Sequence, residues 1–116
     1  MYQDAVAPAL DLTFDTPKAR DETIVRCAGR ITSDTSASLV TTVRLLIPES
    51  KRIVLDLTQV DYIDSSGIGA LVSLWVSTKR ANCEFRLIHL SERIKDLLRI
   101  SNLSKILEGD QDYFGM

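Results

Sequence analysis

The sequence has no long hydrophobic run, one histidine and only two cysteines. Its longest strongly apolar stretch, Ile68–Val76, is far shorter than the roughly 20 residues of a membrane-spanning helix, so we expect no membrane insertion. Residues 1–4 lack the cationic and apolar segments of a secretory signal, so the cytoplasm is the expected location. Cys27 and Cys83 match no metal-ligand spacing and are expected to be buried free thiols.

The chain also lacks the patterns of several ligand-binding classes. Its 14 basic and 16 acidic residues are well mixed, and no basic stripe marks a nucleic-acid surface. Neither a Gly-x-Gly-x-x-Gly pattern nor a Gly-Lys-Ser/Thr phosphate loop is present, and no His, Cys, Asp and Glu set has metal-ligand spacing. We therefore expect no cofactor and no direct nucleic-acid partner.

With 45% hydrophobic and 26% charged residues among 116, the chain has the composition of one soluble domain. Residues 1–8 are expected to form a flexible arm, 9–110 the domain and 111–116 a polar tail. Apolar patterning predicts strands over 10–15, 24–28 (ended by Gly29), 53–57 and 85–90, the third of them covered on both faces. It predicts helices from a cap within 32–35 to Pro48, over 66–79, and from Ser91 to 101–102, then a short element over 103–107. This order predicts an α/β fold with a mixed four- to five-stranded sheet, right-handed crossovers and helices mainly on one face.

The turn between the third strand and the second helix reads Asp64-Ser65-Ser66-Gly67. Either Asp64 or Ser65 would cap the helix, which is worth about 1 kcal/mol, but capping does not explain two consecutive hydroxyls. A phosphate on Ser65 would lie at the positive helix end, where free N–H groups favour it. It would also add about two negative charges beside Asp61 and Asp64 and so repel a docked partner. The turn therefore predicts a binding switch that leaves the fold intact.

An enzymatic role for the same turn is the less favoured hypothesis. Ser65 as a nucleophile needs a base within hydrogen-bond reach, and the single histidine, His89, is expected to be structural at the end of a strand. Asp56, Asp61 and Asp64 are better explained as turn and cap residues than as an acid–base pair. We expect no catalytic residues.

Residues 53–58, Val60 and the run from Ile63 to Gly69 (Ile-Asp-Ser-Ser-Gly-Ile-Gly) resemble the signature of the STAS-domain anti-sigma factor antagonists, or anti-anti-sigma factors. The resemblance covers about residues 8–108 and implies a STAS-like fold. It implies that a serine-kinase-type anti-sigma factor phosphorylates Ser65. The unphosphorylated protein would bind that kinase and release its sigma factor, and a PPM-type phosphatase would restore it. ATP would belong to the kinase. The implied acceptor loop and partner-binding residues are Asp61, Asp64, Ser66, Gly67 and Ile68.

Three departures from the family pattern bear on the partner surface. Arg30-Ile31-Thr32 stands where the family often has an acidic residue, an aliphatic residue and Asp, and Asn102 replaces a usual glycine. The predicted apolar stripe of the second helix is Ile68, Leu71, Val72 and Trp75. Leu74 and Val76 lie off that stripe, where relatives commonly carry polar or basic residues. They indicate either a more buried helix or a second contact, such as a homodimer. The alternative function is a constitutive STAS scaffold subunit of a stress-sensing assembly or a lipid transport system.

Overall fold

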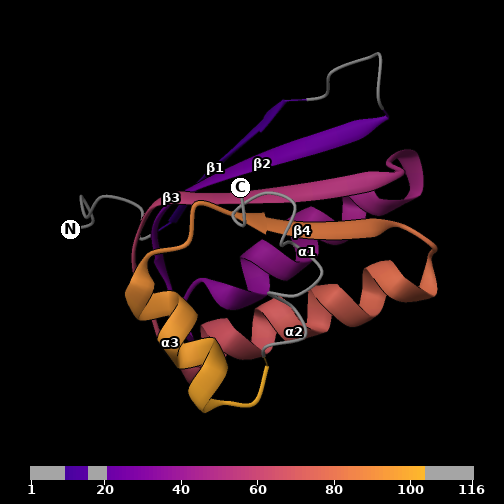
Figure 1. Cartoon of the computed structure of the whole chain (residues 1–116). Coiled ribbons are helices and arrows are strands. Elements are labelled where there is room, and N and C mark those ends of the chain that lie inside the picture. Colours follow the sequence, from indigo (N-terminus) through magenta and orange to yellow (C-terminus); the bar gives the residue numbers. More distant parts are fainter. Residues whose placement is uncertain (1–9, 16–20, 104–116) are drawn as a thin grey trace.

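The computed structural model describes residues 10–15 and 21–103. Its strands are β1 (Leu10–Asp15), β2 (Glu22–Ile31), β3 (Arg52–Ile63) and β4 (Glu84–Ile88), and its helices are α1 (Ser36–Leu46), the short 3₁₀ helix η1 (Ile47–Glu49), α2 (Ser65–Arg80) and α3 (Glu92–Ile100). Figure 1 shows how these elements are arranged. The expected arm at 1–8, all but Leu103 of the element expected over 103–107, and the tail at 111–116 lie outside the described residues.

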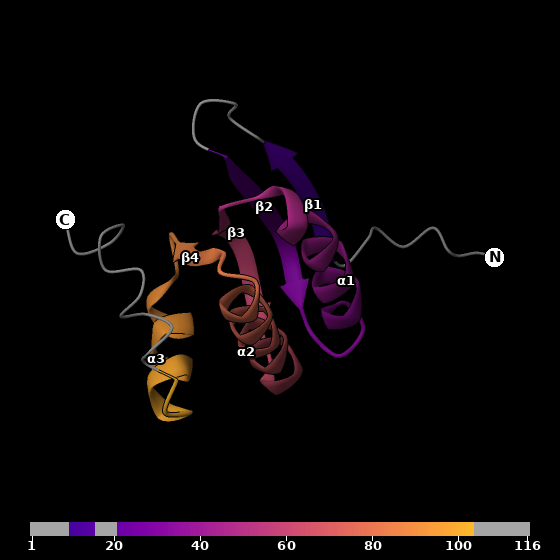
Figure 2. The same cartoon turned by 90° about the vertical axis from the view of Figure 1, so that its right-hand side faces the viewer.

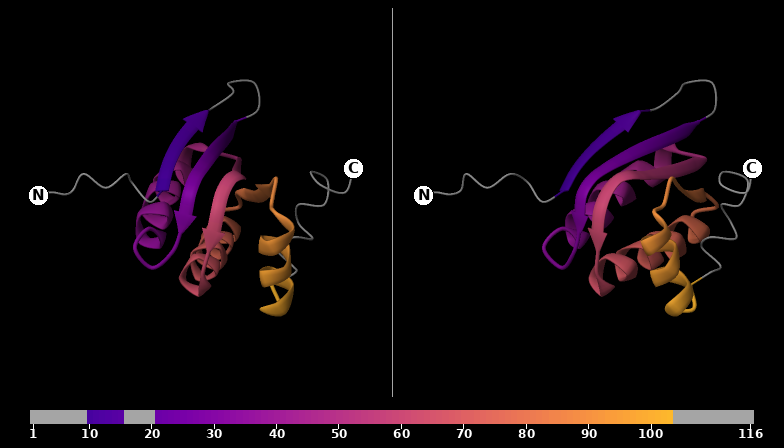
Figure 3. Two further views of the ribbon diagram at one scale, coloured as in Figure 1. Left: turned by 90° about the vertical axis from the view of Figure 1, so that its left-hand side faces the viewer. Right: turned by 60° about the vertical axis from the view of Figure 1, so that its left-hand side comes forward.

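The described strands form one mixed sheet in the order β1-β2-β3-β4. β1 and β2 are antiparallel, as expected of a hairpin, whereas β2, β3 and β4 are parallel and are joined through α1 and α2. α1 and α2 lie side by side on one face of the sheet, and α3 lies on the same side near the β4 edge (Figures 2 and 3). The predicted fold class, a mixed sheet with helices mainly on one face, is confirmed.

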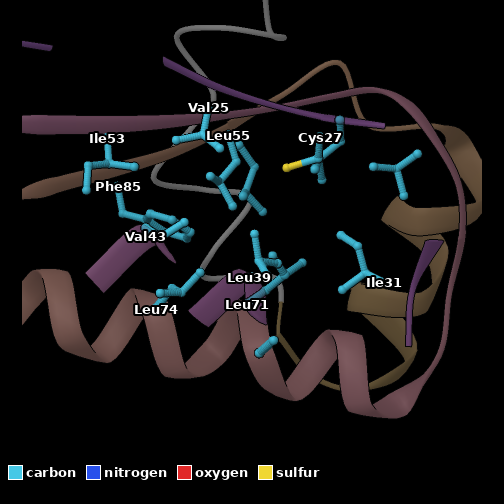
Figure 4. Close-up of a cluster of buried hydrophobic side chains, with 14 of the residues drawn as sticks. Val25, Cys27, Ile31, Leu39, Val43, Ile53, Leu55, Leu71, Leu74 and Phe85 are labelled. Atoms are coloured by element: carbon cyan, nitrogen blue, oxygen red, sulfur yellow. The ribbon is translucent and has the colours of Figure 1, made fainter. Parts of the chain in front are cut away.

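The core lies between the sheet and the two crossover helices (Figure 4). Val25 on β2 and Leu55 on β3 face Leu39 on α1 and Leu71 on α2, and all four are fully buried. Burying side chains of this size stabilises the fold by about 1.5–3 kcal/mol each. Cys27 and Cys83 are buried free thiols, as the sequence predicts.

β3 is longer than expected, and β2 does not end at Gly29. The 12 residues of β3 pair with the 10 residues of β2, because β3 carries one extra residue at each of two register shifts. One shift lies between Arg26 and Ala28, and the other between Gly29 and Arg30. Such bulges break the alternation of buried and exposed side chains, which is the signal used to recognise a strand.

β4 is shorter than expected: it ends at Ile88 rather than Leu90. His89 adopts a positive φ of 60°, a left-handed conformation that a strand cannot continue.

The buried face of α2 is shifted from the predicted stripe, of which Ile68 and Leu71 are buried. Its buried residues are Gly67, Ile68, Ala70, Leu71, Leu74 and Thr78. Val72 and Trp75, expected in the stripe, are only half-buried. The rows 67–71–74–78 and 68–71–72–75 share helical spacing, so periodicity alone could not choose between them.

Candidate functional site

The turn before α2 is organised by Asp64. Its Oδ1 accepts a hydrogen bond from the Gly67 N–H at 3.0 Å, and its backbone carbonyl accepts one from the Ile68 N–H at 2.9 Å. Asp64 is therefore the N-cap, and Ser65 is the first residue of the helix. The Ser65 side chain is exposed and makes no hydrogen bond within the described residues. The cap thus leaves a free hydroxyl at the helix N-terminus.

Gly67 brings the start of α2 against the ends of β2 and β3. A Cβ at this position would lie 2.3 Å from the carbonyl oxygen of Ile31 and 2.5 Å from Cγ1 of Ile63. The Asp64 N–H also donates to the carbonyl oxygen of Ile31, at 3.3 Å. The helix end is therefore fixed on the strand ends, and Ser65 has a defined position at the carboxyl edge of the sheet.

The loop between β2 and α1 ends at the same edge. Thr35, the N-cap of α1, makes no side-chain cap bond. Its hydroxyl donates to the Arg30 carbonyl at 2.7 Å and accepts from the Thr32 N–H at 2.9 Å, which holds the loop closed. A shallow groove of about 320 Å³ runs between α1 and α2 beside Ser66. Arg44 borders this groove and donates to the Ser73 hydroxyl at 2.9 Å.

The expected partner-binding residues divide into two groups. Asp61 and Ser66 are exposed and Asp64 is half-buried, so these three contribute to the surface of the turn. Gly67 is buried and Ile68 is only 8% exposed and belongs to the core, so these two position the turn instead of forming its surface.

Leu74 and Val76 of α2, for which the sequence leaves open a more buried helix or a second contact, also differ. Leu74 is 0% exposed, so it is a core residue and not part of a contact surface. Val76 is 39% exposed and remains available.

One exposed pair at this edge was not foreseen. The guanidinium of Arg30 lies 5.6 Å from the ring centroid of Tyr62, which is itself 39% exposed. The sequence marks Arg30 as a departure from the family pattern but contains no signal for the exposure of Tyr62, because that exposure depends on a bulge in β3.

His89 lies far from the turn and is bonded elsewhere. Its Nδ1 is 3.0 Å from the Thr58 hydroxyl and 3.1 Å from Oδ1 of Asp56. Asp56 lies on β3 roughly 20 Å before the end of the strand at Ile63, where the Ser65 turn begins. Burial by itself would raise the pKa of Asp56, but hydrogen bonds from Thr58 and His89 hold that pKa below its ordinary value. His89 therefore interacts with the Asp56 carboxylate and is not placed to act as a base for Ser65.

Within residues 10–15 and 21–103, no group of three or more His, Cys, Asp or Glu side chains is placed to hold a metal ion. None of the helices in these ranges is both long enough and apolar enough to cross a membrane.

Comparison with known proteins agrees with this geometry. The sequence model of the STAS domain matches residues 13–113, and the chain belongs to this family. An anti-sigma-B factor antagonist of Listeria monocytogenes is 41% identical over 54 residues, which cover 47% of each chain. The matched part thus spans about half the length of that curated relative.

Solved structures share the fold. An anti-sigma factor antagonist from Mycobacterium paratuberculosis superposes with a TM-score of 0.73 at 17% identity, over 85% of this chain and 84% of that one. The phosphorylated form of the Bacillus protein SpoIIAA gives a TM-score of 0.66 at 14% identity, over 82% and 86%. At these identities the similarity establishes the fold alone.

Proposed function

We propose that this chain is an anti-sigma factor antagonist that is switched by phosphorylation of Ser65. The unphosphorylated protein binds a serine-kinase-type anti-sigma factor and so releases a sigma factor. The phosphoprotein does not bind until a PPM-type phosphatase removes the phosphate. The observation that carries the proposal is the exposed, unbonded hydroxyl of Ser65 at the start of α2, with the capping role taken by Asp64.

The local physics fits a modification that changes binding without unfolding the protein. The Gly67 N–H already donates to Asp64, but the other first-turn N–H groups of a helix have no intrahelical partners and can receive a phosphate. The phosphate brings about two negative charges to a surface that already carries Asp61 and Asp64. A partner docked there meets both charge repulsion and the desolvation of a dianion, so affinity falls while the core is untouched.

The names of similar proteins support the proposal. The Listeria relative is named an anti-sigma-B factor antagonist. SpoIIAA, which shares this fold, is an anti-sigma factor antagonist with structures in unphosphorylated and phosphorylated forms.

The test is phosphate mapping with a matched control in the same turn. The protein is incubated with ATP and each serine-kinase anti-sigma factor of the same genome, and the products are analysed by tandem mass spectrometry. Wild type and Ser66→Ala are expected to gain one phosphate, and Ser65→Ala none. Ser66 is a suitable control because it is also an exposed hydroxyl in the first turn of α2. A phosphate on Ser66, or no transfer with any of the kinases, contradicts the proposal.

The alternative, a constitutive scaffold that self-associates through α2, now depends on Val76, since Leu74 is buried. A scaffold of this kind forms a dimer that Val76→Lys disrupts, and its partners bind Ser65→Asp as tightly as wild type. Sedimentation and partner affinity therefore separate the two proposals. The switch predicts a large loss of affinity for Ser65→Asp.

A further inference from the structure

The exposed pair Arg30 and Tyr62 lies at the carboxyl edge of the sheet and is placed there by a bulge. Gly29 pairs with Val60, but the next residue of β2, Arg30, pairs with Tyr62, so Asp61 is the extra residue of β3. As a result Asp61 and Tyr62 are both exposed, between the buried Val60 and Ile63. Bulges of this kind redirect side chains and are enriched near functional sites.

Arg30 has no carboxylate partner within the described part of the chain, although other arginines do. Arg52 forms ion pairs with Glu22 and Glu84, and Arg99 with Asp96. The Arg30 guanidinium lies over the face of the Tyr62 ring, 5.6 Å from its centroid. A cation–π contact of this kind favours a position of the guanidinium near the ring and leaves its planar N–H groups open to a ligand. Such a group is suited to bind a carboxylate through two parallel hydrogen bonds.

The backbone next to the pair is packed against the start of α2. Ile31 pairs with Ile63, and the start of α2 rests on Ile31 through the close approach of Gly67. Because Ile31 and Ile63 are buried toward the helices, the exposed side chains of Arg30 and Tyr62 are directed to the other side of the strand ends. The guanidinium is therefore directed away from α2, at the exposed side of the strand ends.

We propose that Arg30 and Tyr62 form a second anchor for the protein that docks at Ser65. Arg30 binds a carboxylate on the kinase surface, and Tyr62 packs against the apolar surface around that carboxylate. Arginine and tyrosine are among the residue types that most often dominate binding energy in interfaces. This inference rests on the proposed function, and it assigns to the kinase an acidic residue that faces the strand ends instead of the Ser65 turn.

The test compares charge reversals at two exposed arginines. Affinity for the kinase that phosphorylates Ser65 is measured by calorimetry, without ATP, for wild type, Arg30→Glu and Arg80→Glu. Arg80 is the matched control because it is exposed at the far end of α2 and undergoes the same change in net charge. At about 0.15 M salt the Debye length is about 8 Å, so the control does not act on the Ser65 turn. Arg30→Gln and Tyr62→Ala, checked for folding by thermal denaturation, guard against a structural effect of the reversal.

We expect Arg30→Glu to weaken binding by about 30-fold or more, Arg30→Gln and Tyr62→Ala to weaken it by smaller factors, and Arg80→Glu to bind as wild type. Wild-type affinity for a folded Arg30→Glu overturns the second anchor, as does an equal loss in Arg80→Glu. If Ser65→Asp still fails to bind in the same experiment, the switch itself stands. If wild type binds none of the kinases, the proposed function fails and this inference fails with it.

Discussion

Substitution of Gly67 by alanine tests the close packing of the start of α2 against the ends of β2 and β3. The new Cβ would lie 2.3 Å from the Ile31 carbonyl oxygen, whereas real Cβ atoms do not come closer than 3.0 Å. The obstacle is backbone, so α2 or the end of β2 must move by roughly 0.7 Å within a close-packed core. Overpacking of this severity costs about 3 kcal/mol, and the better helix propensity of alanine returns about 1 kcal/mol. We expect a net loss of about 2 kcal/mol in the free energy of unfolding.

Gly69→Ala is the matched control, because a Cβ there meets nothing within 4 Å. It removes a glycine from the same helix without a clash and is expected to stabilise the protein by about 1 kcal/mol. Urea denaturation followed by circular dichroism measures both changes, with an unchanged m-value showing that only stability has changed. If Gly67→Ala is as stable as Gly69→Ala, the close approach described here is wrong.

Three further predictions concern single side chains. Asp64→Ala removes the cap of α2 and should lower the free energy of unfolding by about 1 kcal/mol, while Asp64→Asn should lose less; urea denaturation distinguishes them. Although burial alone would raise the pKa of Asp56, hydrogen bonds hold it below 3.8 in the folded state. Its contribution to stability is therefore complete above that pH and is lost as the pH falls through the lower folded value; acid titration of Asp56→Asn should lack this loss. Burial raises the pKa of the Cys27 thiol to about 12, so Ellman's reagent at about pH 8 should label it only on unfolding, and rapid labelling of the native protein would contradict this.

Much of the fold could be predicted from sequence because local patterns and tertiary packing agree there. The alternation over 10–15, the cap at Ser91 and the apolar run 53–57 each predicted the element found. Prediction failed where β3 continues to Ile63, because its bulges place buried residues three apart, at Leu57, Val60 and Ile63. A period of three is neither the strand nor the helix signal.

The candidate site likewise combines features that local sequence predicts with features that depend on tertiary packing. Chemistry visible in the sequence offered Asp64 or Ser65 as the cap and Ser65 as the proposed phosphoacceptor, because a cap beside a hydroxyl depends on local structure alone; the structure assigns the cap to Asp64. The burial of Leu74 and the exposure of Tyr62 depend on how α2 and β3 pack against other elements. Leu74 is buried because of the way α2 is rotated toward the sheet. Tyr62 is exposed because of the bulge in β3 at Asp61. The proposed docking surface therefore needed the structure, whereas the proposed phosphoacceptor did not.

A phosphate on Ser65 is proposed to abolish binding without unfolding the protein. The most direct measurement is the calorimetric affinity of the kinase for the purified unphosphorylated protein and for the same protein phosphorylated at Ser65, with circular dichroism on both. We predict superimposable spectra and an affinity at least about 30-fold lower for the phosphoprotein. Equal affinities for two folded forms would contradict the account.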